Sequence, residues 1–308
     1  MKEFNICLTF DTDSDPLEKN HKNSISFNNL DFSLDKISNK IKEIEDKIQL
    51  KIPISWFVRI DNQIKNEFGN YDWLLKKYSK YWENEIFKKN EIHWHAHIYE
   101  NLNGNWAFPK SDDFFKMNIE KIYQFLSKNN FDPKCIRVGE AYMTNNIMNF
   151  LKDLGLKADS SCIPGRSRKD KEKFFDWSAS PNKPYFPSKS NYQLNDINQN
   201  KFLEIPMNTI KTKCNYDKSS LLRYANLAFK NEVIYKGLKE YIDKNDLLVT
   251  ISHPYEFFDI FDNNTNLLCN NLNSLEVNIK TIIEICKDQK KQIKFIKINE
   301  IIKKFTNE

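Results

Sequence analysis

Short apolar runs that favour β-strands alternate with longer segments of helical periodicity along almost all of this 308-residue sequence. This alternation restricts the fold more than any other feature, because strands separated by helices pair in parallel and are covered by their connecting helices. The expected strands are residues 4–10, 54–60, 91–99, 135–139, 202–206, 247–253 and 293–298. The expected helices are residues 34–50, 71–89, 114–128, 145–154, 221–241 and 275–287. The sequence therefore predicts an α/β protein with a parallel sheet, open or closed into a barrel.

One stretch, about residues 164–200, interrupts the alternation. It is rich in Ser, Pro, Lys and Asn, and it also contains the aromatic residues Phe174, Phe175, Trp177, Tyr185 and Phe186. A flexible linker would not carry so many large apolar side chains, so we expect an ordered insertion over the functional site. We expect residues 1–308 to form a single domain that includes this insertion.

Composition excludes several classes of protein. The formal net charge is only +5, from 47 basic and 42 acidic residues, and the charges alternate on helix faces without a basic stripe, so a nucleic-acid polymer is not the expected partner. The six cysteines are scattered, with no C-x-x-C pair, which favours reduced thiols. We find neither a signal-peptide pattern nor an apolar run of about 18 residues. The expectation is a cytoplasmic protein, with peripheral association at the inner membrane face as a second option.

Three of the five histidines fall within five residues, at His93, His95 and His97. Because side chains alternate across a strand, the three imidazoles should project from the same face. Imidazole is a common metal ligand and a poor core residue, so this spacing favours a metal site. The alternative is a buried polar cluster without a metal.

Acidic residues follow the first expected strand, where Asp11, Asp13 and Asp15 come directly after the run LTF. In parallel α/β folds the carboxyl ends of the strands carry the active site. Two carboxylates at i and i+2 can divide the work, with one on a metal and the other acting as a base. Taken alone, the D-x-D pattern fits a polar loop or a helix N-cap equally well.

Arg137 and His253 also stand at the ends of expected strands. The chain has five arginines against 42 lysines, and a guanidinium can hold a carboxylate by two hydrogen bonds, which lysine cannot. A structural ion pair is the alternative for Arg137. His253 follows the apolar run LLVTI, which suits a general acid, although a lone histidine is often structural. In a closed or nearly closed barrel, all these strand ends converge.

The segments LTFDTD, EIHWHAH, IRVGE, FLEIP and VTISHPYE occur in the order found in the NodB-homology polysaccharide deacetylases, carbohydrate esterase family 4. The chain resembles this family from about Phe4 to Glu256, and it is most similar to a WbmS-like subgroup from surface-polysaccharide and O-antigen gene clusters. The resemblance implies a distorted TIM-like (β/α)7 barrel. It also implies a metal-dependent deacetylase that hydrolyses the N-acyl amide, with N-acetyl expected, of a sugar. The sugar could be free, nucleotide-linked or lipid-linked, and zinc is the expected divalent metal.

The resemblance further implies roles for individual residues. Asp11 would be the catalytic base, Arg137 would order that base, and His253 would protonate the leaving amine. The metal ligands would be Asp13, His95 and His97.

Substrate contacts follow from the same resemblance. FFDWS resembles the fourth motif of the family and would bring Asp176 and Trp177 to the substrate. A backbone N–H near Tyr142 would stabilise the oxyanion. Trp177, Trp94 and Tyr255 are candidate walls for a sugar ring, with packing in the core as the alternative for each.

The second and third motifs depart from the family pattern. In E-I-G-x-H the second ligand lies four residues after the first, and here that position after His95 is Tyr99. We therefore choose His95 and His97, as in an H-x-H subgroup, with the pair His93 and His97 in reserve. His93 also replaces the usual Gly, and the usual Pro after Arg137 is missing, so the shape of the oxyanion pocket differs from the family pattern.

Three other functions fit part of the pattern. The same barrel could hydrolyse cyclic imides or ureides, and a screen of acetylated sugar nucleotides against hydantoin-type compounds would separate the two activities. A sugar-binding relic is disfavoured because Asp11, Asp13, Arg137 and His253 are intact. A metal-independent glycosidase with paired carboxylates leaves the histidines unexplained, and sensitivity to a chelator would decide it.

Overall fold

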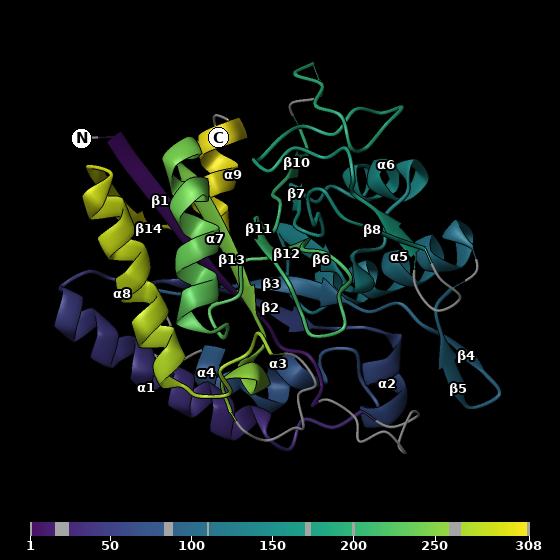
Figure 1. Ribbon diagram of the computed structural model, residues 1–308. Helices are drawn as coiled ribbons and strands as arrows, with labels where there is room; N and C mark the ends of the chain where they lie inside the picture. The colour runs from purple at the N-terminus through teal and green to yellow at the C-terminus, as the bar shows by residue number, and fades with distance from the viewer. Residues whose placement is uncertain are drawn as a thin grey trace.

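A parallel eight-stranded sheet forms the centre of the computed structural model, which describes residues 2–15, 25–82, 89–109, 111–169, 174–198, 201–258 and 266–306 (Figure 1). The strand order is β10-β7-β6-β3-β2-β1-β13, and β14 pairs with the beginning of β1. The strands are β1 Lys2–Asp11, β2 Ile54–Arg59, β3 Glu91–Ala96, β6 Cys135–Val138, β7 Ala158–Asp159, β10 Leu203–Glu204, β13 Leu247–Ser252 and β14 Lys291–Phe295. Their carboxyl ends therefore point in one direction.

The sheet curls into an incomplete barrel, because β10 and β13 at its two ends are joined by irregular chain. The backbone N–H of Asn208 donates to the carbonyl of Val249 at 3.1 Å, and its side-chain oxygen accepts from the Val249 N–H at 2.6 Å. Ala225 continues the link, donating to the Asn208 carbonyl and accepting from Ile251. The predicted distorted TIM-like barrel is confirmed in this form.

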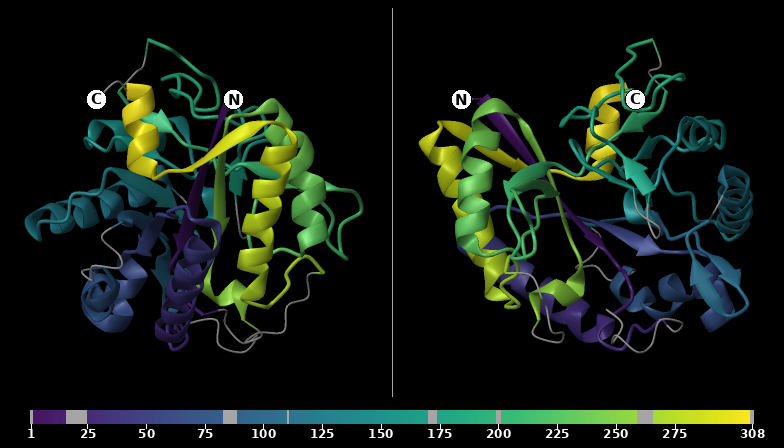
Figure 2. Two further views of the ribbon diagram at one scale, coloured as in Figure 1. Left: turned by 90° about the vertical axis from the view of Figure 1, so that its left-hand side faces the viewer. Right: turned by 45° about the vertical axis from the view of Figure 1, so that its right-hand side comes forward.

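Helices cover the outside of the curled sheet, and α7 and α8 lie side by side along one flank (Figure 2). The helices are α1 Leu30–Ile48, α2 Asn62–Phe68, α3 Trp73–Lys77, α4 Ser79–Trp82, α5 Asp112–Lys128, α6 Asn145–Asp153, α7 Asn231–Lys244, α8 Asn273–Asp288 and α9 Ile298–Thr306. Side-chain caps begin α5 and α6, where Ser111 and Thr144 accept hydrogen bonds from backbone N–H groups three residues later. Within the described residues, no helix combines the length and apolarity needed to cross a bilayer.

The barrel has its own small apolar interior, separate from the larger core between sheet and helices. Cys7 and Phe57 belong to this interior, together with Ile298 and Ile302 of α9. The C-terminal helix α9 thus fills the interior from the side of the barrel opposite the strand ends that carry Asp11, His95 and His253. Side chains at those strand ends are left to form a pocket.

Several predicted boundaries were wrong. Residues 221–241 were expected to be helical throughout, but Leu221–Tyr224 forms strand β12, which pairs with β11 at Thr209–Thr212, and α7 begins only at Asn231. The apolar spacing could not reveal this, because the strand partner precedes β12 in the sequence and lies outside the window in which periodicity is read. The expected helix 71–89 is divided into α3 and α4, and residues 83–88 lie outside the described residues.

The expected insertion at residues 164–200 contains a short hairpin, β8 Ser167–Lys169 with β9 Phe174–Asp176, and irregular chain that returns toward β10. Residues 170–173 and 199–200 lie outside the described residues. Phe175, Trp177 and Tyr185 are buried. These aromatic residues anchor the segment to the barrel. A further hairpin, β4 Glu100–Leu102 with β5 Asn105–Ala107, follows β3.

Candidate active site

Asp13, His95 and His97 meet at the carboxyl ends of β1 and β3. The Oδ1 atom of Asp13 lies 3.1 Å from Nε2 of His95 and 3.0 Å from Nε2 of His97, and the two Nε2 atoms are 2.9 Å apart. His95 is buried, and the side chains of His97 and Asp13 are 11% and 19% exposed. Three ligand atoms thus form a nearly equilateral triangle that is open toward a pocket.

Second contacts of the imidazoles place the proton of each ring, in its neutral form, on Nδ1 and leave Nε2 unprotonated. His95 Nδ1 lies 2.9 Å from the carbonyl of Arg137, which can only accept, so Nδ1 holds the proton. Tyr99 donates its hydroxyl to Glu140 at 2.7 Å, and therefore accepts from His97 Nδ1 at 3.3 Å. Both Nε2 lone pairs consequently point into the same small space.

This arrangement fits a bound cation. The Asp13 Oδ1 atom is buried and accepts no hydrogen bond from the described residues, although two imidazole nitrogens lie about 3 Å away. Three lone-pair atoms so close together repel one another unless a positive charge lies between them. Tetrahedral zinc with bonds of about 2.0 Å would hold its ligand atoms about 3.3 Å apart, which is close to the observed spacing.

Asp11 stands beside this cluster without joining it. Its Oδ1 atom accepts a hydrogen bond of 2.5 Å from Arg137, and its Oδ2 atom lies 3.8 Å from His95 Nε2. The guanidinium of Arg137 is buried, stacks 3.8 Å from the ring centre of Phe57, and also donates to Thr9 and to both oxygens of Ser160. Arg137 therefore fixes one oxygen of Asp11 and leaves the other facing the cluster of Asp13, His95 and His97.

His253 approaches the cluster from β13. Its Nε2 atom is 3.3 Å from Asp13 Oδ2, and its Nδ1 atom is 3.2 Å from Glu256 Oε1. Glu256 is held in turn by the backbone N–H of His253 at 2.7 Å and by the amide of Asn226 at 2.8 Å. The ring of Tyr255 stacks on the imidazole with centroids 5.3 Å apart. The histidine is thus held on both sides.

Charge proximity shifts the pKa values of these groups. Burial alone would raise the pKa of Asp13, but the charges of His97 and His95 outweigh it and hold that pKa well below its usual value. Burial disfavours charge on His95, yet Asp11 and Asp13 raise its pKa. The pKa of His253 is also raised, against burial, by Tyr255 and Glu256.

The pocket above the cluster has a volume of about 350 Å³. One wall is the turn Val138–Ala141, in which Glu140 and Ala141 both have left-handed backbone (φ 59° and 54°). Arg168, Phe175, Tyr224 and Tyr255 contribute to the other walls. Reactive groups therefore lie at the base of the pocket, and aromatic and cationic side chains surround its opening.

Some residues expected to contact substrate lie elsewhere. Trp177 is fully buried and donates its indole N–H to the Ala141 carbonyl at 2.8 Å, so it supports the pocket wall and does not line the pocket. Tyr142 and Asp176 do not line the pocket either; the Tyr142 hydroxyl donates to Asp112, and Asp176 accepts from Ser178. The Tyr142 N–H, expected at the oxyanion, already lies 3.5 Å from the Gly139 carbonyl.

Two other residues of strand β3, Trp94 and His93, are also buried. Trp94 is fully buried and donates to the Ile60 carbonyl at 2.7 Å, so the core alternative holds for it. His93, the reserve ligand, is buried against Phe57 and lies 2.9 Å from Glu91. Among the described residues, the ligand cluster contains His95 and His97 and not His93.

Sequence reasoning missed the acids that hold the imidazoles. Glu256 orients His253, and Glu140 reaches His97 through a tyrosine hydroxyl. Asp61 accepts from the His97 backbone N–H at 3.4 Å and from Arg59 at 2.7 Å. Asp61 and Glu256 each follow an expected strand, which is a usable signal. Glu140 directly follows the expected strand 135–139 and carries the same signal, although its left-handed backbone could not be predicted.

No family model and no curated protein matches this chain. Among solved structures, a protein from Mycobacterium smegmatis that is assigned as a polysaccharide deacetylase aligns over 99% of this chain and 91% of its own, with 14% identity and a TM-score of 0.54. The chain has the fold of a polysaccharide deacetylase. The expected resemblance is thereby confirmed at the level of the fold.

Two further structures align with lower scores. A protein from Bordetella bronchiseptica, assigned as a polysaccharide deacetylase involved in O-antigen biosynthesis, aligns over 91% of this chain and 89% of its own, with 11% identity and a TM-score of 0.42. A 4-alpha-glucanotransferase from Thermococcus litoralis aligns over 98% of this chain and 38% of its own, with 12% identity and a TM-score of 0.42. In the deacetylase fold described here, the cluster occupies the strand ends, where parallel barrels carry their active sites.

Proposed function

We propose that this protein is a metal-dependent deacetylase that hydrolyses the N-acyl amide, with N-acetyl expected, of a sugar used in surface-polysaccharide synthesis. The observation that carries the proposal is the Asp13–His95–His97 triangle of lone pairs beside a separately held carboxylate. In their neutral form the two imidazoles turn unprotonated nitrogens toward a buried carboxylate oxygen, which a structural ion pair does not account for. Deacetylation in the cytoplasm, on a precursor, is the setting that we propose.

Asp13, His95 and His97 would hold a divalent metal, with zinc expected from the mixed nitrogen and oxygen ligands. When bound there, such an ion lowers the pKa of water to about 7 and polarises the amide carbonyl. The remaining work falls to side chains of the chain itself. The turn Val138–Ala141 lines the same pocket. The Val138 N–H already donates to Ser161, so the N–H groups of Gly139, Glu140 and Ala141 would stabilise the oxyanion, a role first expected near Tyr142.

Proton transfer is divided between two residues on opposite sides of the cluster. Asp11 takes a proton from the attacking water on its Oδ2 atom, while Arg137 holds its Oδ1 atom. His253 protonates the leaving nitrogen of the sugar, and Glu256 fixes the orientation of its ring. The carbon–nitrogen bond breaks, and acetate and the free amine leave. Tyr255 forms a wall of the pocket beside this step.

The substitution Asp11→Asn tests the division of labour. An asparagine keeps an oxygen for Arg137 but cannot accept the proton, so kcat should fall by a factor of about 10² to 10⁴. Metal content should stay at one ion per chain, because Asp11 lies outside the ligand triangle. Acetate release and elemental analysis of the same samples measure the two quantities.

Asp15→Asn is the matched control, since this acid follows the same strand but accepts hydrogen bonds from Ser26 and Asn29. It should retain both metal and turnover. Loss of metal from the Asp11→Asn variant, or full turnover in it, would refute the assigned roles.

A further inference from the structure

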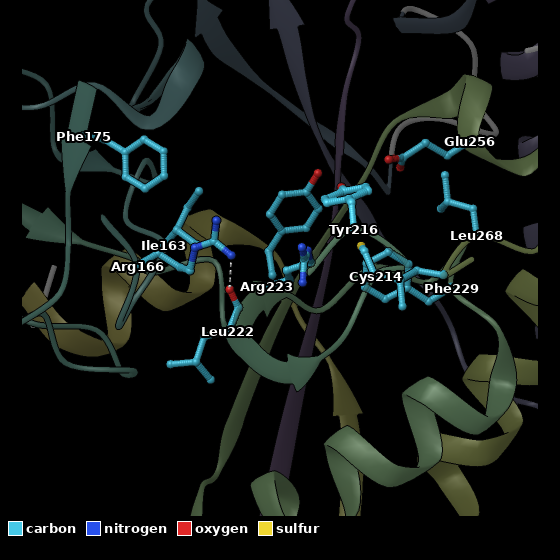
Figure 3. Close-up of a pocket in the computed structure, with 12 residues that line it drawn as sticks. Ile163, Arg166, Phe175, Cys214, Tyr216, Leu222, Arg223, Phe229, Glu256 and Leu268 are labelled. Carbon is cyan, nitrogen blue, oxygen red and sulfur yellow. Dashed lines mark hydrogen bonds between the residues drawn. The ribbon is translucent and has the colours of Figure 1, made fainter. Parts of the chain in front are cut away.

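A second cavity, of about 240 Å³, adjoins the active-site pocket. The two spaces share Ile163, Phe175 and Tyr224 as walls, so they are separated by the thickness of single side chains at most. Figure 3 shows the side chains that line this second cavity, including Arg166 and Arg223. The sequence motifs that predicted the catalytic site did not predict this second cavity.

The arginines of the chain are concentrated around these two spaces. The sequence has only five arginines against 42 lysines. Arg59 and Arg137 are buried beneath the site, Arg168 lines the active-site pocket, and Arg166 and Arg223 line the adjoining cavity. Among the described residues, no lysine lines either space. Planar guanidinium groups are thus found where a flat anion could be bound by two hydrogen bonds.

The two arginines that line the second cavity, Arg223 and Arg166, differ in whether a carboxylate neutralises their charge. Arg223 is paired with both oxygens of Asp217 at 2.9 Å. Arg166 donates to the Leu222 carbonyl at 2.9 Å, and no described carboxylate lies within ion-pair distance of it. Burial and the neighbouring charge of Arg223 lower the pKa of Arg166, as expected for cations held close together. Within the part of the chain that the structure describes, the guanidinium of Arg166 therefore has no ion-pair partner of its own.

The only carboxylate among the described lining residues is already engaged. Glu256 contacts His253 and accepts from Asn226. Apolar and aromatic side chains complete the cavity, among them Phe229, which is buried, and Tyr216, whose side chain is 66% exposed. An exposed aromatic ring next to a cationic wall suits a ligand that has both a negative charge and a flat or apolar group.

We propose that this second cavity binds the phosphates of a sugar diphosphate, with Arg166 as the main contact, while the acylated sugar occupies the active-site pocket. The shared chemistry is a diphosphate bonded to the sugar, whether a nucleoside or a lipid lies at its other end. The sugar part of the inference rests on the proposed function. The phosphate part rests on the cavity and its arginines.

Binding of uridine diphosphate to the full-length protein, measured by calorimetry, tests the phosphate part. We expect Arg166→Gln to weaken binding at least tenfold and Arg166→Lys to restore part of it, and we expect affinity to fall with added salt. Lys211→Gln, on β11 and outside both spaces, is the matched control and should bind like the wild type. Absence of binding, or equal binding by Arg166→Gln with an unchanged melting temperature, would overturn the proposal.

Acetate release from three acceptors tests the sugar part: a nucleoside diphosphate N-acetyl sugar, a polyprenyl diphosphate N-acetyl sugar and the free N-acetyl sugar. We expect kcat/KM to be at least tenfold higher for one of the diphosphates, which identifies the group at its far end. In Arg166→Gln the ratio of diphosphate to free sugar should fall toward one. Equal turnover of all three refutes this inference but supports deacetylation. Binding that depends on Arg166, with no acetate from any acceptor, supports the cavity and refutes the proposed function.

Discussion

The ring of His97 lies against a residue that has no side chain. A Cβ atom placed on Gly139 would come within 2.4 Å of His97 Nδ1 and within 2.6 Å of two ring carbons. On its other contacts, the ring is held by the Tyr99 hydroxyl and by His95. Only glycine at position 139 therefore lets the ring keep Nε2 directed at Asp13.

Gly139→Ala should weaken zinc binding by a factor of about 10 to 100, the range found when a group that orients a metal ligand is lost. Calorimetric titration of metal-free protein with zinc measures the change. Gly237→Ala is a suitable control, because its Cβ would come within 2.8 Å of Ile210 between α7 and β11, away from the site. That variant should lose stability but keep its zinc affinity. Equal zinc affinity in Gly139→Ala and wild type would contradict this account of the ring.

At the residue scale, the sequence could predict which side chains lie around the same pocket, but it could not predict which ones are buried. Asp11, Asp13, His95, Arg137 and His253 lie around one pocket, because each stands at the end of a parallel strand. Trp177 belongs to a motif that predicted substrate contact, yet its side chain is fully buried. Burial of a tryptophan depends on chain that is distant in sequence, and no local pattern reports it.

Among the elements, the neighbouring strands β7 and β10 bring two carboxyl groups together inside the protein. Asp159 and Glu204 are adjacent in register and fully buried. Asp159 accepts two hydrogen bonds from Ser161, and Glu204 accepts one from the Cys162 N–H at 3.1 Å. Burial, and next the charge of Asp159, raise the pKa of Glu204 well above its usual value. Two charged carboxylates are therefore disfavoured at this place, and a proton shared by the pair relieves their repulsion.

A raised carboxyl pKa makes a stability contribution that is complete at low pH and is lost as the pH rises. Glu204→Gln replaces the protonated acid, so relative to wild type it should gain free energy of unfolding by up to about 1.4 kcal/mol per pH unit above about pH 4.5. Urea unfolding from pH 4 to pH 8 measures this difference.

Glu91→Gln is a control for that experiment, because its stability difference from wild type should change with pH in the opposite direction. Burial disfavours charge on Glu91, but its contacts with His93 prevail and lower its pKa. This variant should lose stability relative to wild type as the pH rises through the acidic range to about pH 4.5, with no further change at higher pH. A pH-independent difference between Glu204→Gln and wild type would exclude the shared proton.

The elements could be predicted where local pattern decides them. The long helices α1, α5 and α8 and the buried strands β1, β2 and β13 follow from periodicity and apolar runs. The two-residue strands could not be placed with certainty, since β7 was missed altogether and is defined by its neighbours. Strand β12 was taken for helix for the same reason, because its partner β11 determines its conformation.

For the molecule as a whole, metal removal is the decisive experiment. Chelation should abolish turnover, and returning zinc should restore it. Zinc at 100 times its dissociation constant should add about 2.7 kcal/mol to the free energy of unfolding, seen as a rise in melting temperature. In Asp13→Asn, zinc should no longer shift the melting temperature. Full acetate release after complete chelation would refute the metal dependence, whereas cleavage of a glycosidic bond by the chelated protein would favour the metal-independent glycosidase.

The barrel is joined between β10 and β13 mainly through Asn208, which bonds to Val249 by both backbone and side chain. A strand between β10 and β13 would form a whole row of hydrogen bonds. Here only Asn208 and neighbouring backbone groups bridge this gap, which we call the seam. His253 stands on one side of the seam, and Arg137 belongs to the sheet that ends on the other. A slight widening there would leave Asp11 and His253 beside each other, because β1 pairs with β13 in the register Phe10–Ser252. The distance between Asp11 and His253 is thus set by the pairing of β1 with β13, whereas Asn208 determines how far this pair of strands lies from β10.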